Sequence, residues 1–473
     1  MVFSSIVFIF YFLPIFFLVY YIVNKKLKNW VLVVASIIFY LWGAPEFFFF
    51  LLGSTILNFY IVKLMSKQKS LFRSRLLLSL SIIINLGLLV YFKYANFFID
   101  NLNFILQSLN ISTLSWVKVI LPIGISFYTF QSITYTVDVY RKVHKPLQKL
   151  HSFILYIMMF PQMIAGPIIR FIDIADQIES RKERVEDYIS GFIRFVIGLS
   201  KKVLIADVLA LEVDRIMLQD YSTMDSTTAW IGIIGFTFQI YFDFSGYSDM
   251  AIGLGKMMGF KFPENFNNPY IARSVTEFWR RWHMTFSTFM RNYLYYPLGG
   301  NRVKTERRLY FNLWFVFLIS GLWHGASWNF IIYGAFHGTF LVLERIFLLK
   351  FLMKMGKIPS IAITFLIIVL ARVFFRIDTL DDAMLYFQKL FEFNFTSFIW
   401  QTKLHFIFIM IVATIISFLP TTKLGVKAEA ILYKEGLSIK EYFIYSFFAV
   451  IFLFYSIASL AGSGFSPFIY FRF

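Results

Sequence analysis

The chain has 473 residues, of which 59% are hydrophobic, 62 are Phe and only 15% are charged, whereas a soluble domain carries about 25% charged residues. This composition excludes an ordinary soluble protein, and apolar runs long enough to cross a bilayer recur along the whole chain. We therefore predict one all-α, polytopic transmembrane domain over residues 1–473, with about a dozen crossings. The absence of Cys excludes disulfides, thiolate catalysis and Cys-ligated metals.

The apolar run from Val2 to Val23 lacks a basic start and a small-residue cleavage site, so we predict a retained span rather than a signal peptide. Basic residues then gather in alternate loops: Lys25, Lys26 and Lys28; Lys63, Lys67, Lys69, Arg73 and Arg75; Arg141, Lys142, Lys145 and Lys149. The loops between them, at 43–46 and 100–115, contain no Lys or Arg. The positive-inside rule places the basic loops in the cytoplasm and both chain ends outside. The net charge of +18 therefore indicates topology rather than nucleic-acid binding.

An irregular segment follows at 160–170, where "FPQMIAGPIIR" contains two prolines and a glycine. Such a sequence is tolerated at membrane depth only where protein or a water-filled cavity satisfies the freed backbone groups. We predict a re-entrant element that lines a cavity.

Further spans are predicted near 189–207, 228–253, 309–324, 327–349, 359–377, 403–420 and 441–461. The second of these contains Asp243 and Asp249, which do not share a helical face closely enough to form a catalytic pair. We expect these two acids to fix neighbouring helices or to line a tunnel.

The segment Glu277 to Arg302 has aromatic residues at helical spacing and basic residues on the other face. The aromatic set is Trp279, Trp282, Phe286, Phe289 and Tyr293. This pattern predicts a helix lying in the membrane interface, on the cytoplasmic side where an anionic donor such as coenzyme A would arrive. Trp279, Arg280 and Arg281 are candidate donor-binding residues, although Arg280 and Arg281, like Glu277, also suit lipid headgroups.

The chain has six histidines. His324 lies in "GLWHGASW" (321–328), at a Gly-flanked junction between two hydrophobic segments, and an ionisable group inside a membrane is by default a functional candidate. A buried structural role is the alternative. His283 and His337 suit hydrogen-bonding or assisting roles, and His144, His151 and His405 suit plain surface or interface roles.

Metal catalysis is not favoured, because no His-x-x-x-His or Glu-x-x-His pair occurs and no Cys can complete a site. Acid–base chemistry fits better. A neutral imidazole can accept the proton of an attacking hydroxyl while a thioester is cleaved.

Five segments, 121–141, 160–170, 241–260, 265–302 and 321–338, closely resemble the membrane-bound O-acyltransferase family. The resemblance is to its polysaccharide branch, the alginate and peptidoglycan O-acetyltransferases, and it extends over most of the chain. One departure is Asn292, where the family pattern has Asp.

The resemblance implies a ring of helices around a thin centre, with a tunnel that joins a cytoplasmic donor side to an outer acceptor side. The family's catalytic histidine maps onto His324, and its second histidine maps onto His283 in an assisting or donor-positioning role. A terminal aromatic motif suggested to carry the acyl group maps onto Phe468, Tyr470, Phe471 and Phe473, with the Tyr470 hydroxyl as the carrier. The alternative for this tail is an anchor of interfacial aromatic residues.

The resulting hypothesis is an acetyltransferase of the bacterial inner (plasma) membrane. It would take acetyl from a cytoplasmic thioester, acetyl-CoA above all, and export it to hydroxyl groups of an extracytoplasmic polysaccharide. An esterase-like (SGNH) partner outside the membrane would complete the transfer, and no metal and no nucleic acid would take part. The alternatives are a D-alanyl exporter of the same family that uses an acyl carrier protein, a non-enzymatic transporter or flippase, and a scaffold for secreted enzymes.

Overall fold

The computed structural model describes residues 2–395, 403–434, 436–463 and 468. Within these ranges the chain forms helices joined by turns and loops, with no β-strand. The prediction of an all-α polytopic protein is confirmed. The described chain divides into two compact units, residues 1–188 with 254–263 and residues 189–253 with 264–473. The prediction of a single domain stays a prediction.

Six helical stretches among the described residues are long and apolar enough to cross a membrane. They are Pro45–Ser66, Leu71–Ser108, Trp328–Met355, Lys357–Arg376, Leu404–Thr421 and Ile439–Gly462. Two shorter apolar helices, Phe8–Ile22 and Lys28–Gly43, precede them. The spans expected near 189–207, 228–253 and 309–324 also form helices, but they are outside this set. Each carries charged or polar side chains that lower its hydropathy.

The first unit contains eight labelled α-helices within its described residues. They are α1 (Leu13–Ile22), α2 (Lys28–Gly43), α3 (Phe48–Ser66), α4 (Leu71–Ser108), α5 (Ile125–Tyr140), α6 (Leu150–Met158), α7 (Phe160–Met163) and α8 (Phe171–Glu179). Aromatic rings hold α1, α2 and α7 together, because Phe12, Phe16 and Phe39 all contact Phe160 at ring-centroid distances between 5.2 and 5.7 Å. After α7 the backbone to residue 170 is irregular and mostly buried. The irregular backbone agrees with the sequence, whereas the re-entrant, cavity-lining role of this segment stays a prediction.

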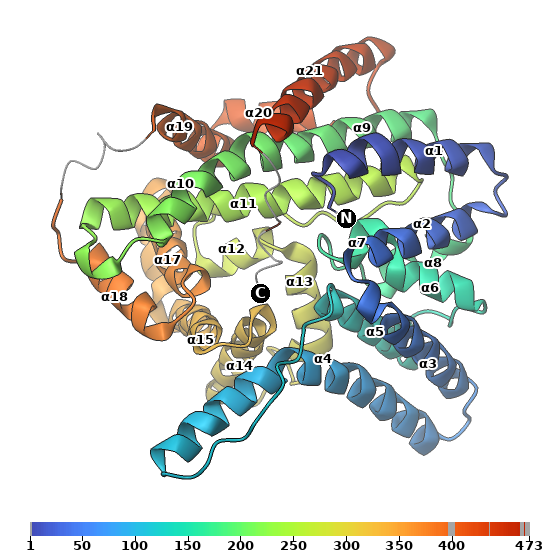
Figure 1. Ribbon diagram of the computed structural model, residues 1–473, viewed down its shortest axis with the longest axis horizontal. Helices are drawn as coiled ribbons and strands as arrows, with labels where there is room; N and C mark the ends of the chain where they lie inside the picture. The colour runs from blue at the N-terminus through green and yellow to red at the C-terminus, as the bar shows by residue number, and fades with distance from the viewer. Residues whose placement is uncertain (1, 396–402, 435, 464–467, 469–473) are drawn as a thin grey trace. The chain divides into compact units, whose positions relative to one another are not determined.

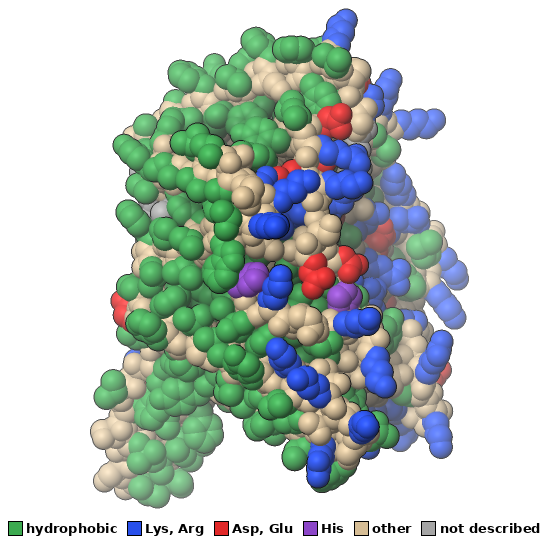
Figure 2. Space-filling model, turned by 90° about the vertical axis from the view of Figure 1, so that its right-hand side faces the viewer, with side chains coloured by type: hydrophobic (Ala, Val, Ile, Leu, Met, Phe, Trp, Pro, Cys, Tyr) green, Lys and Arg blue, Asp and Glu red, His purple; other side chains and the backbone are tan. Residues whose placement is uncertain are grey.

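Exposed basic side chains of this unit lie in the loops that the sequence singled out. They include Lys25, Lys26, Lys67, Lys69, Arg73, Arg75, Arg141, Lys142, Lys145 and Lys149. In the view of Figure 2, Lys and Arg side chains gather together, while hydrophobic side chains cover a broad area with few charges. This separation is typical of a membrane protein whose basic loops face one aqueous side.

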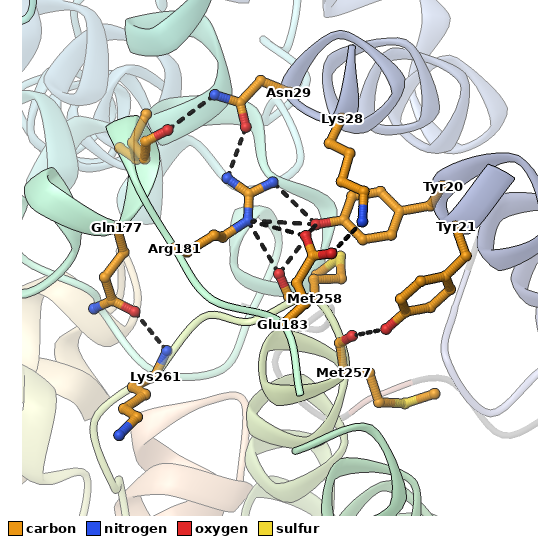
Figure 3. A network of polar contacts seen from close by, with 11 residues as sticks. Tyr20, Tyr21, Lys28, Asn29, Gln177, Arg181, Glu183, Met257, Met258 and Lys261 are labelled. Atoms are coloured by element: carbon orange, nitrogen blue, oxygen red, sulfur yellow. Dashed lines mark hydrogen bonds and ion pairs between the residues drawn. The ribbon is translucent and has the colours of Figure 1, made fainter. Parts of the chain in front are cut away.

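A polar network ties the start of the chain to the segment after α8 (Figure 3). Arg181 donates to the Met258 carbonyl at 3.0 Å and to the Asn29 side chain at 2.7 Å. Glu183 accepts from the Tyr20 hydroxyl at 2.7 Å and pairs with Lys28, which is itself buried. Buried charges persist in a fold when they are paired and hydrogen-bonded. We infer that this network fixes the loop between α8 and the next helix.

The second unit contains the remaining described helices, from residue 189 onward. They are α9 (Val185–Ser200), α10 (Asp207–Met217), α11 (Ser226–Met257), α12 (Val275–Arg281), α13 (Met284–Phe289), α14 (Glu306–His324), α15 (Trp328–Leu343), α16 (Leu349–Met355), α17 (Lys357–Arg376), α18 (Leu380–Leu390), α19 (Leu404–Phe418), α20 (Lys423–Leu432) and α21 (Ile439–Ser463). Helices α9 and α10 run alongside α11, and α12 to α15 gather with α17 (Figure 1).

Two glycines allow α14 and α15 to pack as a close hairpin (Figure 1). A Cβ atom added at Gly321 would lie 2.1 Å from the Phe330 carbonyl oxygen, and one added at Gly334 would lie 2.4 Å from the Phe317 carbonyl oxygen. No side chain fits at such distances, so the absence of a Cβ is what sets the spacing. The hairpin matters for function because His324 is the last residue of α14.

The two acids of α11 are ion-paired, in agreement with the role that the sequence predicts. Asp249 bonds to Arg194 and to Lys201, each at 2.7 Å. Asp243 lies 3.0 Å from Lys202, which also pairs with Asp207. The acids therefore join α11 to α9 and to the π-helical turn Lys201–Ala206 that follows it.

Candidate functional site

The basic aromatic segment after residue 275 is broken at His283. Helix α12 ends at Arg281, His283 has φ 45° and ψ 54°, and α13 begins at Met284. The prediction of one continuous amphipathic helix is therefore wrong. Aromatic residues recur every three or four positions on both sides of the break, so their spacing does not reveal the break. Trp282 and Phe286 are 1% exposed, so these aromatic residues are buried in protein.

The His283 imidazole is held by Asn265. Its Nδ1 lies 3.0 Å from Asn265 Oδ1, which also accepts from the Thr285 hydroxyl at 2.9 Å, while Asn265 Nδ2 donates to Ser248 Oγ at 3.0 Å. Because this network makes Oδ1 an acceptor, Nδ1 of the histidine is the atom that carries hydrogen. Nε2 is buried without a hydrogen-bond partner among the described residues.

Burial also keeps His283 neutral. The residue lies outside the candidate membrane spans, and desolvation lowers the pKa of its imidazole from 6.5 to about 3. A neutral ring with hydrogen on Nδ1 presents a lone pair at Nε2. His283 can therefore accept a proton or a hydrogen bond at that atom.

His324 and His283 share the phenyl ring of Phe286 as a neighbour. The Phe286 ring is centred 5.0 Å from the His283 ring and 5.6 Å from the His324 ring. His324 is 3% exposed, and Tyr333 and Phe375 complete its surroundings at 5.8 and 5.3 Å. The structure thus brings together the two histidines that lie in separate sequence motifs.

His337 belongs to the same aromatic cluster but has a hydrogen-bonding role, as its sequence setting suggests. Its Nδ1 accepts from the Trp279 indole at 3.3 Å, and its ring contacts Tyr333 at 4.7 Å. Trp279 is a predicted donor-binding residue, but its indole N–H is hydrogen-bonded to His337 within the protein. Trp279 itself is 5% exposed.

The two predicted donor-binding arginines differ in their surroundings. Arg280 is exposed. Arg281 is half-buried, bonds to Glu277 at 2.9 Å and donates to the Asn267 carbonyl at 3.1 Å. Asn267 in turn lines a pocket, so Arg281 is bonded to a residue of the pocket wall.

A pocket of about 810 Å³ lies between α9, α11, α20 and the chain before α12. Its polar wall includes Ser248, Asn265, Asn267 and Tyr433, and Met284 also lines it. Asn265 is a hydrogen-bonding partner of His283, and Met284 follows His283 in the chain. The pocket therefore reaches the residues that hold this imidazole.

Arg372 is a functional candidate that the sequence reading missed. It lies in α17, inside the candidate span Lys357–Arg376, and is 1% exposed. A charge within an apolar run is a detectable signal, but this arginine lies four residues before Arg376, and the pair resembles an ordinary basic helix end. No comparable signal marks Asn265, whose importance comes from its contacts.

The terminal aromatic motif is only partly within the described structure. Tyr470, Phe471 and Phe473 lie outside the described residues. Phe468 is buried, with its ring 4.7 Å from that of Tyr247 and 5.8 Å from that of Phe244. Phe244 contacts the His283 ring at 4.7 Å. Phe468 is thus separated from the His283 ring by the single ring of Phe244.

The described residues contain no group of three or more His, Asp or Glu side chains arranged to hold a metal ion. The other histidines have separate surroundings. His144 pairs with Asp176 at 3.1 Å, His151 stacks on Trp30 at 4.7 Å, and His405 is exposed.

The model of the membrane-bound O-acyltransferase family matches residues 18–358, which contain His283, His324 and His337. The chain belongs to this family. As a membrane-bound O-acyltransferase it is an enzyme that transfers acyl groups.

Several curated relatives share the family. The chain is 44% identical to the probable alginate O-acetylase AlgI of Pseudomonas aeruginosa over 396 residues, 83% of this chain and 75% of that protein. It is 40% identical to the peptidoglycan O-acetyltransferase of Helicobacter pylori over 421 residues, 81% and 78% of the two chains. A teichoic acid D-alanyltransferase of Bacillus subtilis is 29% identical over 238 residues, 48% and 59% of the two chains.

Proposed function

We propose that this membrane-bound O-acyltransferase takes acetyl from a cytoplasmic thioester, acetyl-CoA, and passes it across the membrane for O-acetylation of an extracytoplasmic polysaccharide. Two relatives support this substrate class by their names, an alginate O-acetylase and a peptidoglycan O-acetyltransferase. The observation that carries the proposal is that His283 and His324 both contact the Phe286 ring, and that Asn265, which bonds to His283, lines a pocket.

In this proposal His324 is the general base. Its imidazole takes the proton of the attacking hydroxyl, and the same proton then goes to the departing thiolate. His283 assists from the donor side, where its neutral Nε2 can accept a hydrogen bond. Asn265 fixes the tautomer and the direction of that ring.

The pocket suits the pantetheine arm of coenzyme A. This arm has amide groups and no charge, and the pocket wall offers the side chains of Asn265, Asn267 and Asn268. The charges in the wall, Arg194 and Lys201 against Asp249, Glu264 and Glu429, do not favour a buried phosphate. The phosphates would remain outside, near the exposed Arg280 and the exposed Lys427 of α20.

The orientation that we propose follows from the basic loops. If these are cytoplasmic, both chain ends lie outside the plasma membrane, and lipid headgroups meet the basic surface. An outer C-terminus suits a relay in which acetyl passes to the Tyr470 hydroxyl and then to a secreted esterase-like (SGNH) partner, which acetylates the polysaccharide. Two steps would replace one difficult transfer. The burial of Phe468 beside Tyr247 supports a role in the site for the motif that contains this residue.

The test is polymer-bound acetate in cells that carry His324→Ala, with membrane levels of the protein equal to the wild type. We expect acetate to fall to background. His405→Ala is the matched control, because this histidine is exposed and distant from the motif in sequence, and it should leave acetate unchanged. Persistent acetylation in His324→Ala would favour the transporter or scaffold alternatives. Polymer-bound D-alanine in place of acetate in wild-type cells would indicate the D-alanyl exporter.

A further inference from the structure

Arg372 is a buried cation that no described carboxylate neutralises. It is 1% exposed and lies within a candidate membrane span. Arg376, one turn further along α17, pairs with Asp214 at 2.8 Å, whereas Arg372 has no such ion pair among the described residues. Removing an unpaired charge from water carries a large free-energy cost. A buried cation without a described carboxylate partner is therefore a candidate to meet an anion that forms during function.

The contacts of Arg372 leave part of its guanidinium available. The group lies 4.4 Å from the Trp282 ring centre and donates from Nη1 to the Tyr333 hydroxyl at 3.3 Å. Nε and Nη2 are buried without a hydrogen-bond partner among the described residues. The Tyr270 hydroxyl donates to the Thr237 carbonyl and can also accept a hydrogen bond from the guanidinium, near which it lies.

The guanidinium and the His324 imidazole share two neighbours. Tyr333 accepts from Arg372, and its ring lies 5.8 Å from that of His324. The Phe375 ring centre lies 5.5 Å from the Arg372 guanidinium and 5.3 Å from the His324 ring. A cation with available N–H donors thus lies in the same aromatic cluster as the proposed base.

We propose that Arg372 stabilises the oxyanion that forms when the acceptor hydroxyl attacks the thioester. This inference rests on the proposed function of His324. The hydroxyl oxygen bonds to the acyl carbon and gives its proton to His324, while the carbonyl electron pair moves to the oxygen. Arg372 donates hydrogen bonds to that oxyanion. The pair then returns, the carbon–sulfur bond breaks, and the thiolate takes the proton from His324. Donors placed where negative charge develops lower the barrier without binding the ground state more tightly.

The first measurement is the rate of CoA release from acetyl-CoA by membrane vesicles that contain the wild type, Arg372→Gln or Arg372→Lys. We expect Arg372→Gln to lower kcat by about 100- to 1,000-fold, as loss of an oxyanion donor does, with little change in the KM for acetyl-CoA. Arg372→Lys should recover part of this loss, since it keeps the charge. An unchanged kcat in folded Arg372→Gln would overturn the inference.

A second measurement separates this chemistry from a packing role. S-carboxymethyl-CoA and S-carbamidomethyl-CoA have nearly the same shape, but the first carries a carboxylate next to the position of the acyl carbon. We expect the wild type to be inhibited at least about 10-fold more strongly by the carboxylate, a difference of about 1.4 kcal/mol. Arg372→Gln should lose this preference, and Arg376→Gln, the control from the same helix, should keep it.

The outcomes also distinguish this inference from the proposed function. A wild type that releases no CoA above the His324→Ala background contradicts the proposed acetyl-CoA chemistry itself. If the wild type turns over acetyl-CoA and Arg372→Gln prefers the carboxylate analogue as strongly as the wild type does, only the role of Arg372 is contradicted.

Discussion

Asn265 holds the His283 ring by its side chain and the following residue, Met284, by its backbone. Its Oδ1 lies 3.0 Å from His283 Nδ1, and its carbonyl oxygen accepts from the Met284 N–H at 2.9 Å. The histidine itself has the left-handed backbone conformation. The direction of the imidazole thus depends on a residue that is 18 positions earlier in the chain.

Asn265→Ala should reduce acetyl transfer by about 10- to 100-fold, the effect typical of losing a group that orients a functional histidine. The ring would lose its fixed tautomer, and the Thr285 and Ser248 side chains would lose partners. Polymer-bound acetate per amount of membrane protein is the measurement. Asn301→Ala, at an exposed asparagine, is the control. Equal activity in the two variants would contradict an orienting role for Asn265.

Stability should fall as the pH drops below 6.5, in part because of His283. The folded-state pKa of its imidazole is lowered to about 3 by burial. Between these values the unfolded chain binds a proton that the folded protein does not, so acid favours unfolding by up to about 1.4 kcal/mol per pH unit. Above pH 6.5 the imidazole is mostly neutral in both the folded and the unfolded chain, so His283 no longer makes the free energy of unfolding depend on pH. Thermal unfolding in detergent at pH 7, 6 and 5 should therefore show a smaller acid-dependent shift for His283→Gln than for the wild type.

We predict opposite effects on stability for Gly321→Ala, in the hairpin of α14 and α15, and Gly87→Ala, in α4. Gly321→Ala should destabilise the protein by about 1–3 kcal/mol or more, because the new Cβ would meet the Phe330 carbonyl. Gly87→Ala in α4 has nothing within 4 Å and should be stabilising by up to about 1 kcal/mol through helix propensity. Melting temperatures of the two purified variants would check this. A Gly321→Ala protein as stable as the wild type would show that the hairpin can separate.

Tyr470→Phe tests the proposed relay, since it removes one hydroxyl and keeps the aromatic ring. We expect polymer-bound acetate to fall to background while the protein remains in the membrane at normal levels. Tyr455→Phe, at a tyrosine that is 60% exposed, should have no effect. Normal acetylation in Tyr470→Phe would leave the tail with an anchoring role alone.

Much of the fold could be predicted from hydropathy and charge. Apolar length marks α4, α15, α17, α19 and α21 clearly, because a membrane span must satisfy its own backbone hydrogen bonds and consist mainly of apolar residues. Segments whose polar residues are buried in protein are harder to recognise. Helix α11 carries Asp243 and Asp249, whose partners lie on a different element, and sequence spacing does not reveal a pairing between elements.

The site was predictable in part, because a polar residue in an apolar motif is visible by itself. His324 and His283 could be found in this way, but their common neighbour Phe286 looked like one aromatic residue of an amphipathic helix. The break at His283 has no Gly or Pro to mark it, since a histidine has the positive φ angle. Arg372 was overlooked because its burial depends on Trp282 and Tyr333, which are distant in sequence.

The break at His283 and the wall of the pocket share the same backbone. Asn265 and Asn267 line the pocket, and their main chains bond to Met284 and Arg281, which flank the break, at 2.9 Å each. A molecule that fills the pocket would therefore contact residues whose backbones bond to both sides of the break. Under the proposed function, we expect these two backbone hydrogen bonds to couple donor binding to the direction of the His283 ring.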